Sequence, residues 1–313
     1  MIKSFLSVFI SIVCSTIVHA QTIDQLIKKF DKSIDSLHTI NEFNGNILLV
    51  KNGIRLYEKS IGFTNSKANQ RLNSSSAFNL ASISKTFTSS LILMYVQEGK
   101  LKIDDQVHSY LPSFPYKDIT IRHLLNHTHG MIEYFDWIND TLKINDTIGN
   151  DQLLVLLSKY KPALNSVPGE KFNYCNTGYA VLSKVLETIS GVPYAALLKS
   201  KITKPLKLEN TYVQTVKMSN SPKNRVYGMQ YKEGRWNTYD LTTLDEVVGD
   251  GNIYSTVYDL QKWDQALRDG KVLKPEILNE AYTPSVLIEK PKMVYGLGWI
   301  INEPGKKVSH SGS

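Results

Sequence analysis

The chain has 313 residues and a formal net charge of +7 at pH 7, with its basic residues spread among acidic ones. It holds neither an arginine-rich stretch nor a basic stripe, so we expect no nucleic-acid partner. Only Cys175 remains after a cleaved leader, which excludes an internal disulfide and suits one large domain stabilised by its core.

Residues 1–20 have the pattern of a secretory signal peptide. Lys3 gives a positive start, residues 5–18 are largely apolar, and residues 18–20 fit a small-residue cleavage site. The apolar core is too short for a comfortable bilayer span, and no later segment is long and apolar enough. We therefore predict cleavage after Ala20, no stable membrane span afterwards, and a periplasmic or secreted protein. An uncleaved anchor is the alternative.

A helix, a hairpin and a second helix are predicted for the first third of the chain. Apolar residues between Ile23 and Leu37 recur at helical spacing. Residues 45–57 form two strand-like runs around Asn52-Gly53, which is the strongest short-range hairpin signal. The mostly apolar segment Leu80–Gln97 predicts a buried helix with Ser82 near its N-terminus.

Helical patterns broken by Pro, Gly and Asn fill the middle of the chain. The clearest predicted helices are Asp151–Tyr160, Gly178–Ser190 and Thr256–Leu267. The last has Thr256 and Asp259 in the spacing of a capping box, and Gly270 suits its C-terminal stop.

Strand patterns return at residues 294–301 and 307–311, joined by a turn at 303–306. Strands at both ends and helices between them predict an α+β protein. We expect an antiparallel sheet built from both chain ends and flanked by helices, with a mostly helical subdomain inserted at about residues 101–244.

The segment Ser82-Ile83-Ser84-Lys85 places a hydroxyl three residues before an amine. On a helix these two side chains share a face, so they can meet. A lysine held neutral can remove the serine proton and so activate a nucleophile. Ser82 and Lys85 are therefore a candidate nucleophile and base.

Two distant segments offer the other groups that such a hydrolase needs. Tyr174-Cys175-Asn176 follows a Pro-Gly turn, and side chains two apart in an extended segment point the same way. The phenol could exchange protons, and the amide could bond a substrate carbonyl. In His310-Ser311-Gly312, the glycine would let a substrate backbone lie close to a strand.

With these three motifs in this order, the chain resembles the serine β-lactamase and penicillin-binding superfamily. The similarity is to its class C β-lactamase-like branch, which includes D-alanyl-D-alanine carboxypeptidases, D-aminopeptidases and carboxylesterases. Residues 124–130 and 249–256 are similar to supporting stretches of the family, and the resemblance covers about residues 44–313. It implies a β-lactamase/transpeptidase-like fold without a cofactor.

The resemblance also implies roles for single residues. Ser82 would be the acylated nucleophile, and Lys85 and Tyr174 would share the proton transfers. Asn176, His310 and Gly312 would bind the substrate. The backbone N–H groups of Ser82 and Ser313 would form the oxyanion hole.

The chain departs from the family pattern in three places. The third motif begins with His310 where many members have Lys, and a mostly neutral His favours peptidase or esterase activity over an efficient β-lactamase. His129 stands where the supporting stretch often has Ser. Family members continue with further strands and a C-terminal helix, so we expect these elements to be missing here.

The leading hypothesis is a hydrolase of residues 21–313 that cleaves an amide or ester through a Ser82 acyl-enzyme. Its partner would be a small molecule or peptide, such as a D-amino-acid peptide or a small ester, with cell-wall peptide and β-lactam as further candidates. A non-catalytic penicillin-binding or sensor relative is the alternative. A zinc hydrolase using His127 and His129 is a remote one, because no third ligand is evident. Cys175 is expected to be a buried filler.

Overall fold

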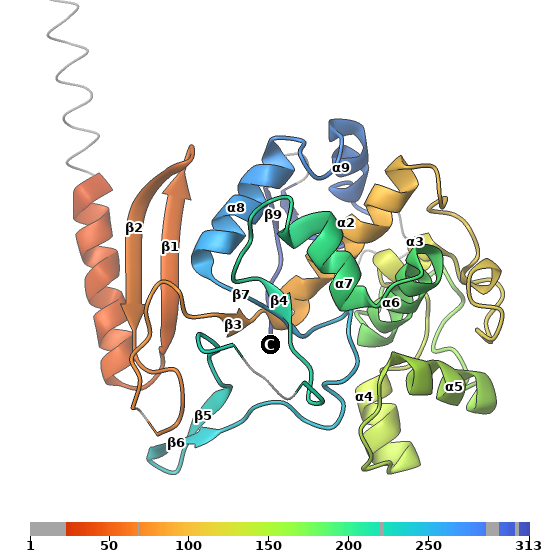
Figure 1. The fold of residues 1–313 in the computed structure, drawn as a ribbon, viewed down its shortest axis with the longest axis horizontal. Helices are drawn as coiled ribbons and strands as arrows, with labels where there is room; N and C mark the ends of the chain where they lie inside the picture. Colours follow the sequence, from red (N-terminus) through yellow and green to blue (C-terminus); the bar gives the residue numbers. More distant parts are fainter. Residues whose placement is uncertain (1–22, 68, 219–221, 286–293, 304–306) are drawn as a thin grey trace, which may run out of the picture. The chain divides into compact units, whose positions relative to one another are not determined.

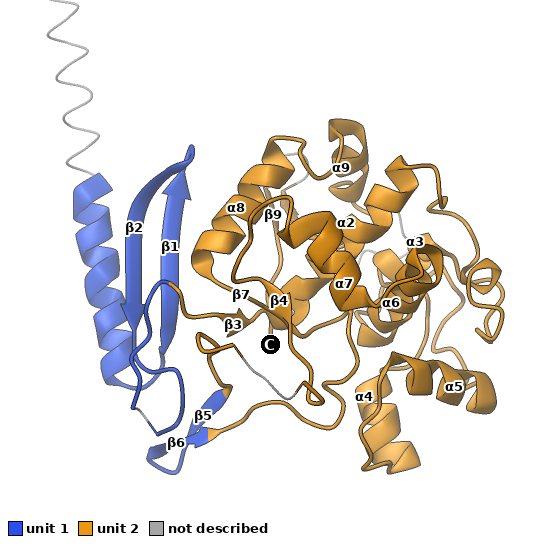
Figure 2. Ribbon diagram, viewed as in Figure 1, with its two compact units in different colours: residues 1–74, 229–237 blue, residues 75–228, 238–313 orange. Residues whose placement is uncertain are grey.

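The computed structural model contains two compact units (Figures 1 and 2). The first comprises residues 1–74 with 229–237, and the second comprises residues 75–228 with 238–313. The structure describes residues 23–67, 69–218, 222–285, 294–303 and 307–313. The predicted signal peptide lies outside the described residues, and the predicted subdomain at 101–244 stays a prediction.

The first unit contains the predicted helix and hairpin. Residues 23–39 are helical. Strands β1 (Gly45–Lys51) and β2 (Ile54–Ile61) pair antiparallel. Asn52 and Gly53 between them have φ of 51° and 77°, as a type I′ turn requires, so the hairpin prediction is confirmed.

Side chains tie that helix to the hairpin. Lys59 of β2 donates to Asp31 at 2.7 Å and to Asp35 at 2.6 Å. The rings of Phe30 and Tyr57 meet edge to face. A further short hairpin, β5 (Met229–Lys232) with β6 (Arg235–Thr238), contributes to this unit.

In the second unit, α6 (Asn176–Ser190) is the central helix. It packs against α2 (Ser84–Gln97), α3 (Ile121–Leu125), α5 (Asn150–Tyr160) and α7 (Tyr194–Leu198), as Figure 1 shows. The predicted helix at 80–97 forms in two parts, because a 3₁₀ turn, η1 (Ala81–Ile83), precedes α2. Because α2 is buried nearly all round, the apolar residues on all its sides have protein partners.

Helix α8 (Val257–Arg268) confirms the prediction for residues 256–267. Thr256 caps it by accepting a bond from Asp259 N at 3.2 Å. The Asp259 carboxylate instead accepts from Asn210 N at 2.7 Å, so only half of the expected capping box forms. Gly270 follows with φ of 67°, as a helix stop requires.

Shorter elements complete the described helices. They are η2 (Val107–Ser109), α4 (Tyr134–Asp136), α9 (Pro275–Ala281) and the π-helical turns η3 (Trp137–Leu142) and η4 (Lys199–Thr203). Among the described helices, none has by itself the length and apolar composition of a bilayer span. Helix α6 and residues 194–203 have the required length and apolar composition only when they are taken together, and the two helical segments are bent by 74° relative to each other.

Three short strands form an antiparallel sheet beside α2, in the order β3 (Phe78–Asn79), β7 (Ile253–Ser255), β4 (Tyr212–Val213). Strand β8 (Ile300–Glu303) pairs with β9 (Lys307–Ser309). The expected single sheet built from both chain ends stays a prediction, because β1 and β2 belong to the first unit and β8 and β9 to the second. In the described residues β1 bonds to β2 and β8 to β9, because strands close in sequence pair at a small loop-closure cost.

The strand boundaries near the C-terminal motif also differ from the prediction. Strand β8 begins at Ile300 rather than at residue 294, because Gly298 has φ of 106° and turns the chain. Strand β9 ends at Ser309, so the His310 motif follows the strand instead of lying on it. Residues 304–306 of the predicted turn lie outside the described part.

Candidate active site

Ser82 lies on a strained turn at the start of α2. The preceding residue, Ala81, has φ of 44°, a left-handed conformation that is uncommon for alanine. Asn79 Oδ1 accepts a bond from Ala81 N at 2.9 Å and holds this turn. Ser82 is half-buried and lines a cavity of about 770 Å³. Backbone strain of this kind is concentrated at functional sites, where it directs a side chain.

Lys85 is fully buried one helical turn beyond Ser82. Its Nζ lies 3.0 Å from Ser82 Oγ, 2.7 Å from Asn176 Oδ1 and 2.8 Å from Asp250 O. The last two oxygens can only accept, so they take both N–H groups of a neutral amine. The lone pair then faces the Ser82 hydroxyl, which is the orientation that a general base needs.

The two candidate proton carriers differ in acidity. Burial lowers the pKa of Lys85 to about 8, although Asp250 and Glu133 oppose the shift by stabilising its charged form. Burial raises the pKa of Tyr174 to about 12, although its hydrogen bond with Ser82 opposes that shift. Near neutral pH Tyr174 is therefore a proton donor, whereas Lys85 can become a neutral base.

A pH profile should report the Lys85 amine. The neutral amine is the active form, so kcat/KM for an uncharged ester should rise about tenfold per pH unit below pH 8 and level off above it. Initial rates from pH 5.5 to 10 at constant ionic strength, corrected for spontaneous hydrolysis, would measure this. A plateau reached only above pH 10, as for an ordinary lysine, would contradict the assignment.

Aromatic rings pack around Tyr174. The centroid of the His127 ring lies 4.2 Å from the centroid of the Tyr174 ring and 4.8 Å from that of the Tyr295 ring. His127 is fully buried with φ of 59°, and its Nδ1 accepts from Cys175 N at 3.2 Å. Burial keeps the pKa of His127 well below its usual value, so the ring is neutral. His127 therefore supports the segment that carries Tyr174 and Asn176.

The geometry gives the zinc alternative no support. His129 Nδ1 accepts from Met131 N at 3.0 Å, just as His127 Nδ1 accepts a backbone bond. Burial lowers the pKa of His129 to about 3. Across the described ranges no three His, Cys, Asp or Glu side chains are grouped to hold a metal ion.

Cys175, between the two residues of the second motif, is fully buried. Its Sγ donates to Ile132 O at 3.3 Å, and burial raises the pKa of the thiol to about 12. A protonated, enclosed thiol is unreactive, in agreement with the expected filler role.

Glu133 is a site residue that the sequence reasoning missed. Its Oε2 accepts from Asn176 N at 2.8 Å and from Asn176 Nδ2 at 3.0 Å. These bonds anchor the first residue of α6 and orient the amide, so that Asn176 Oδ1 faces Lys85. In the sequence, the position of Glu133 just after the supporting stretch 124–130 is the signal that could have indicated its role.

Two substitutions of Glu133 should separate the effect of its charge from the effect of its hydrogen bonds. Glu133→Gln keeps an acceptor for Asn176 but removes a charge that favours the Lys85 ammonium, so the rise of kcat/KM should move to lower pH. Glu133→Ala leaves Asn176 N unpaired, which costs about 1–3 kcal/mol of stability, and kcat/KM should fall about tenfold or more. Thermal unfolding and pH profiles of both variants measure this. Identical profiles in wild type and Glu133→Gln would contradict the electrostatic role.

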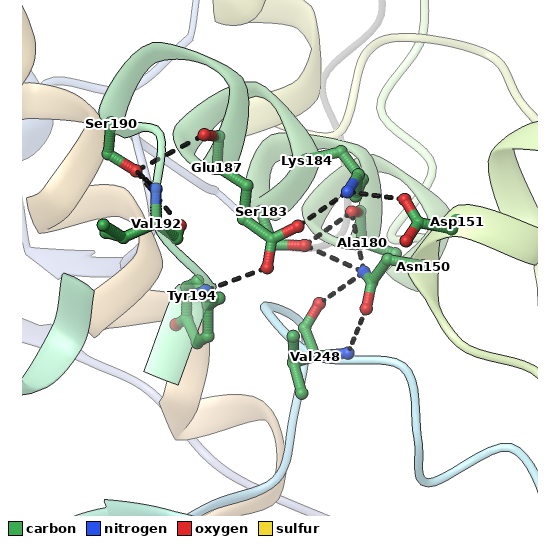
Figure 3. Close-up of polar contacts among 10 residues, drawn as sticks. All are labelled: Asn150, Asp151, Ala180, Ser183, Lys184, Glu187, Ser190, Val192, Tyr194 and Val248. Atoms are coloured by element: carbon green, nitrogen blue, oxygen red, sulfur yellow. Dashed lines mark hydrogen bonds and ion pairs between the residues drawn. The ribbon is translucent and has the colours of Figure 1, made fainter. Parts of the chain in front are cut away.

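Asp250 is a second missed residue, and the loop before it is tightly fixed. The side chain of Asn150 donates to Val248 O and accepts from Val248 N, both at 2.9 Å, and also bonds Ser183 of α6 (Figure 3). Gly249 then passes so close to α6 that a Cβ would lie 2.6 Å from Tyr179 O. These contacts fix the backbone so that the Asp250 carbonyl accepts a hydrogen bond from Lys85.

The Asp250 side chain is also buried, with 4% of its surface exposed. Tyr134 donates to its Oδ2 at 3.0 Å, whereas Oδ1 has no hydrogen-bond partner in the described part of the chain. Burial raises the pKa of this carboxyl, and Lys85 opposes the shift. The supporting stretch 249–256 contained Asp250, but nothing in the pattern marked it as a neighbour of the lysine.

The third motif lies against the nucleophile turn. A Cβ on Gly312 would be 2.3 Å from Leu80 O, so only glycine allows this approach. Ser313 and Ser82 line the same cavity, together with Asn176. The structure thus brings together the residues predicted to form the oxyanion hole.

His310 has protein partners for both ring nitrogens. Its Nδ1 donates to Ser311 O at 2.7 Å, because a carbonyl can only accept. Its Nε2 therefore accepts from Tyr295 OH, also at 2.7 Å. Burial lowers the pKa of His310 to about 4, so the ring is neutral. Tyr295 was not predicted, and the contact between His310 and a substrate stays a prediction.

Residues 24–313 match the Beta-lactamase family, and the chain belongs to this family of serine hydrolases with the β-lactamase/transpeptidase fold. It is similar to penicillin-binding protein 4* of Bacillus subtilis (strain 168), with 32% identity over 299 residues, 91% of this chain and 66% of the relative. It is 28% identical over 257 residues to the teichoic acid D-alanine hydrolase of Staphylococcus aureus, covering 82% of this chain and 61% of the relative. The chain thus spans less than two thirds of the length of either.

A solved structure agrees with this assignment. The penicillin-binding protein from Bacillus halodurans superimposes with a TM-score of 0.75 at 28% identity. The match covers 87% of this chain and 84% of that one. The expected α+β fold is therefore confirmed.

Proposed function

We propose that the chain is a serine hydrolase that cleaves an amide or ester through an acyl-enzyme on Ser82. The observation that carries this proposal is the buried Lys85, whose Nζ lies 3.0 Å from Ser82 Oγ while acceptors occupy its other N–H positions. A surface lysine would need neither burial nor two fixed acceptors. A base, in contrast, must have its lone pair aimed at the proton it removes.

The groups suit a two-step acyl transfer. Ser82 Oγ attacks the substrate carbonyl while Lys85 takes its proton, and the N–H groups of Ser82 and Ser313 stabilise the oxyanion. Tyr174 passes a proton to the leaving alcohol or amine. Water then attacks the acyl-enzyme, releases the acid and returns the proton to Ser82.

A D-amino-acid peptide or a small ester is the preferred substrate class. The names of the two relatives, a penicillin-binding protein and a teichoic acid D-alanine hydrolase, support substrates from the cell wall. Because His310 is neutral, it offers no cation to the carboxylate of a β-lactam. Cleavage of the leader at Ala20 would place residues 21–313 in the periplasm or outside the cell.

A parallel assay tests this function. The full chain is offered a nitrophenyl ester, a D-Ala-D-Ala peptide and a chromogenic cephalosporin, and we expect saturable turnover of the ester with the cephalosporin at least about tenfold slower in kcat/KM. Stoichiometric acylation without turnover of any substrate would support the non-catalytic binder instead. Loss of activity in a strong chelator would revive the zinc alternative.

A further inference from the structure

Two consecutive carbonyls of the loop before β7 bond to two side chains of α2. Thr88 Oγ1 lies 2.6 Å from Gly249 O, and Lys85 Nζ lies 2.8 Å from Asp250 O. Because residues three apart share a helix face, Thr88 follows Lys85 by one turn, just as Lys85 follows Ser82. The candidate nucleophile, the candidate base and Thr88 therefore occupy regularly spaced positions of one segment.

The hydroxyl of Thr88 bonds the loop rather than its own helix. A buried threonine in a helix can bond the carbonyl one turn earlier. Thr88 Oγ1, however, lies 3.4 Å from Ser84 O and only 2.6 Å from Gly249 O. A carbonyl can only accept, so the single Thr88 proton goes to Gly249 O. Tyr194 OH, 2.6 Å from Thr88 Oγ1, must then be the donor to Thr88.

The contact between Thr88 and the loop is enclosed by protein. Thr88 and Tyr194 are fully buried, and Gly249 is buried as well. Without the Thr88 hydroxyl, Gly249 O would lose a donor that bulk water does not readily replace, so the loop would have to shift. Asn150 fixes the preceding residue, Val248, through both of its backbone groups (Figure 3). Thr88 thus holds the carbonyl that directly precedes the acceptor of the base.

We propose that Thr88 is a positioning residue, which holds the loop so that Asp250 O stays bonded to Lys85 Nζ. The lone pair of the neutral amine then faces Ser82 Oγ. This proposal rests on the proposed function, because the orientation of Lys85 affects the rate only if Lys85 is the base. Thr88 is absent from the described lining of the cavity, so it acts through the loop and not on the substrate.

Thr88→Val tests this role, because it removes the hydroxyl and nearly keeps the shape of the side chain. We expect kcat for a nitrophenyl ester to fall about tenfold or more with KM little changed, since a small misplacement of a catalytic group is costly. Asp250 O favours the charged amine as an acceptor, so its displacement should also move the rise of kcat/KM to lower pH. Thr88→Ser keeps the hydroxyl and should restore both values. The titratable groups that face Lys85 are the same in all these variants: Asp250, Glu133, Cys175, His127, His310, Tyr174 and Tyr179.

Tyr194→Phe is the matched control. It breaks the bond between Tyr194 and Thr88, as Thr88→Val does, but it leaves the bond from Thr88 to Gly249 O in place. We expect this variant to have a lower melting temperature and the wild-type kcat and pH midpoint. Rates are compared below the lowest melting temperature of the set, because unfolding alone would lower the rate without moving the midpoint.

The outcomes separate the two proposals. Wild-type kcat and midpoint in folded Thr88→Val overturn the positioning role, and so does an equal fall of kcat in Thr88→Val and Tyr194→Phe. If Thr88→Val does not fold, Thr88→Cys supplies a weaker donor, and an unchanged kcat in that variant overturns the role as well. Wild-type turnover in each of these cases leaves the hydrolase proposal standing. If the wild type hydrolyses no ester and is not acylated on Ser82, the hydrolase proposal fails and the positioning role fails with it.

Discussion

Replacing Ser82 by alanine should lower kcat for a nitrophenyl ester by about 10⁴-fold or more. The substitution removes the only atom that can carry the acyl group, whereas the oxyanion donors and the substrate pocket remain. Because Ser82 is half-buried and alanine is smaller, we expect the melting temperature to change little. Steady-state rates and thermal unfolding of the purified variant measure both effects.

The matched control is Ser113→Ala, an exposed serine outside the cavity lining. It should keep wild-type rates and wild-type labelling by a fluorophosphonate. Undiminished ester hydrolysis in a folded Ser82→Ala protein would show that another group is the nucleophile.

Lys85→Met should have the second-largest effect, because it removes the base without changing the length of the side chain much. General base catalysis contributes about 10²–10⁴-fold, and we expect kcat/KM to fall within this range. Lys85→Arg should be about as inactive, because a guanidinium keeps the charge but stays protonated at all working pH values. Rates of both variants at pH 8.5, where wild-type Lys85 is largely neutral, measure the loss.

The exposed Lys159 provides the control Lys159→Met, which should keep wild-type rates. Lys85→Met leaves Asn176 Oδ1 and Asp250 O without their donor, so rates should be compared well below its own melting temperature. If Lys85→Arg retained wild-type activity, charge rather than proton transfer would explain the role of this residue.

Local patterns predicted the parts of the fold that short segments determine. The Asn52-Gly53 hairpin formed because two successive positive φ angles suffice to close it. The helices α5, α6 and α8 began within two residues of their predicted starts, since periodicity and capping are local properties. The sheet expected from strands of both chain ends stays a prediction, because pairing between distant strands does not follow from local patterns.

The residues of the site also fall into two groups, those that local spacing indicates and those that only contacts between distant segments reveal. Ser82 and Lys85 lie one helical turn apart, and Tyr174 and Asn176 share one extended segment, so spacing alone could indicate them. Glu133, Asp250 and Tyr295 act through contacts with residues 15 to 165 positions away, and single acidic or aromatic residues carry no periodic signal. Tertiary structure was therefore needed to show that the charges of Asp250 and Glu133 act on the candidate base Lys85 and that His310 is held neutral.

The most direct test of the acyl-enzyme is mass spectrometry of the full chain after reaction with a fluorophosphonate. We predict one added phosphonyl group per chain, with the modified peptide mapping to Ser82, and labelling that rises with pH as Lys85 loses its proton. A mass shift located on another residue, or labelling that persists in folded Ser82→Ala, would contradict it.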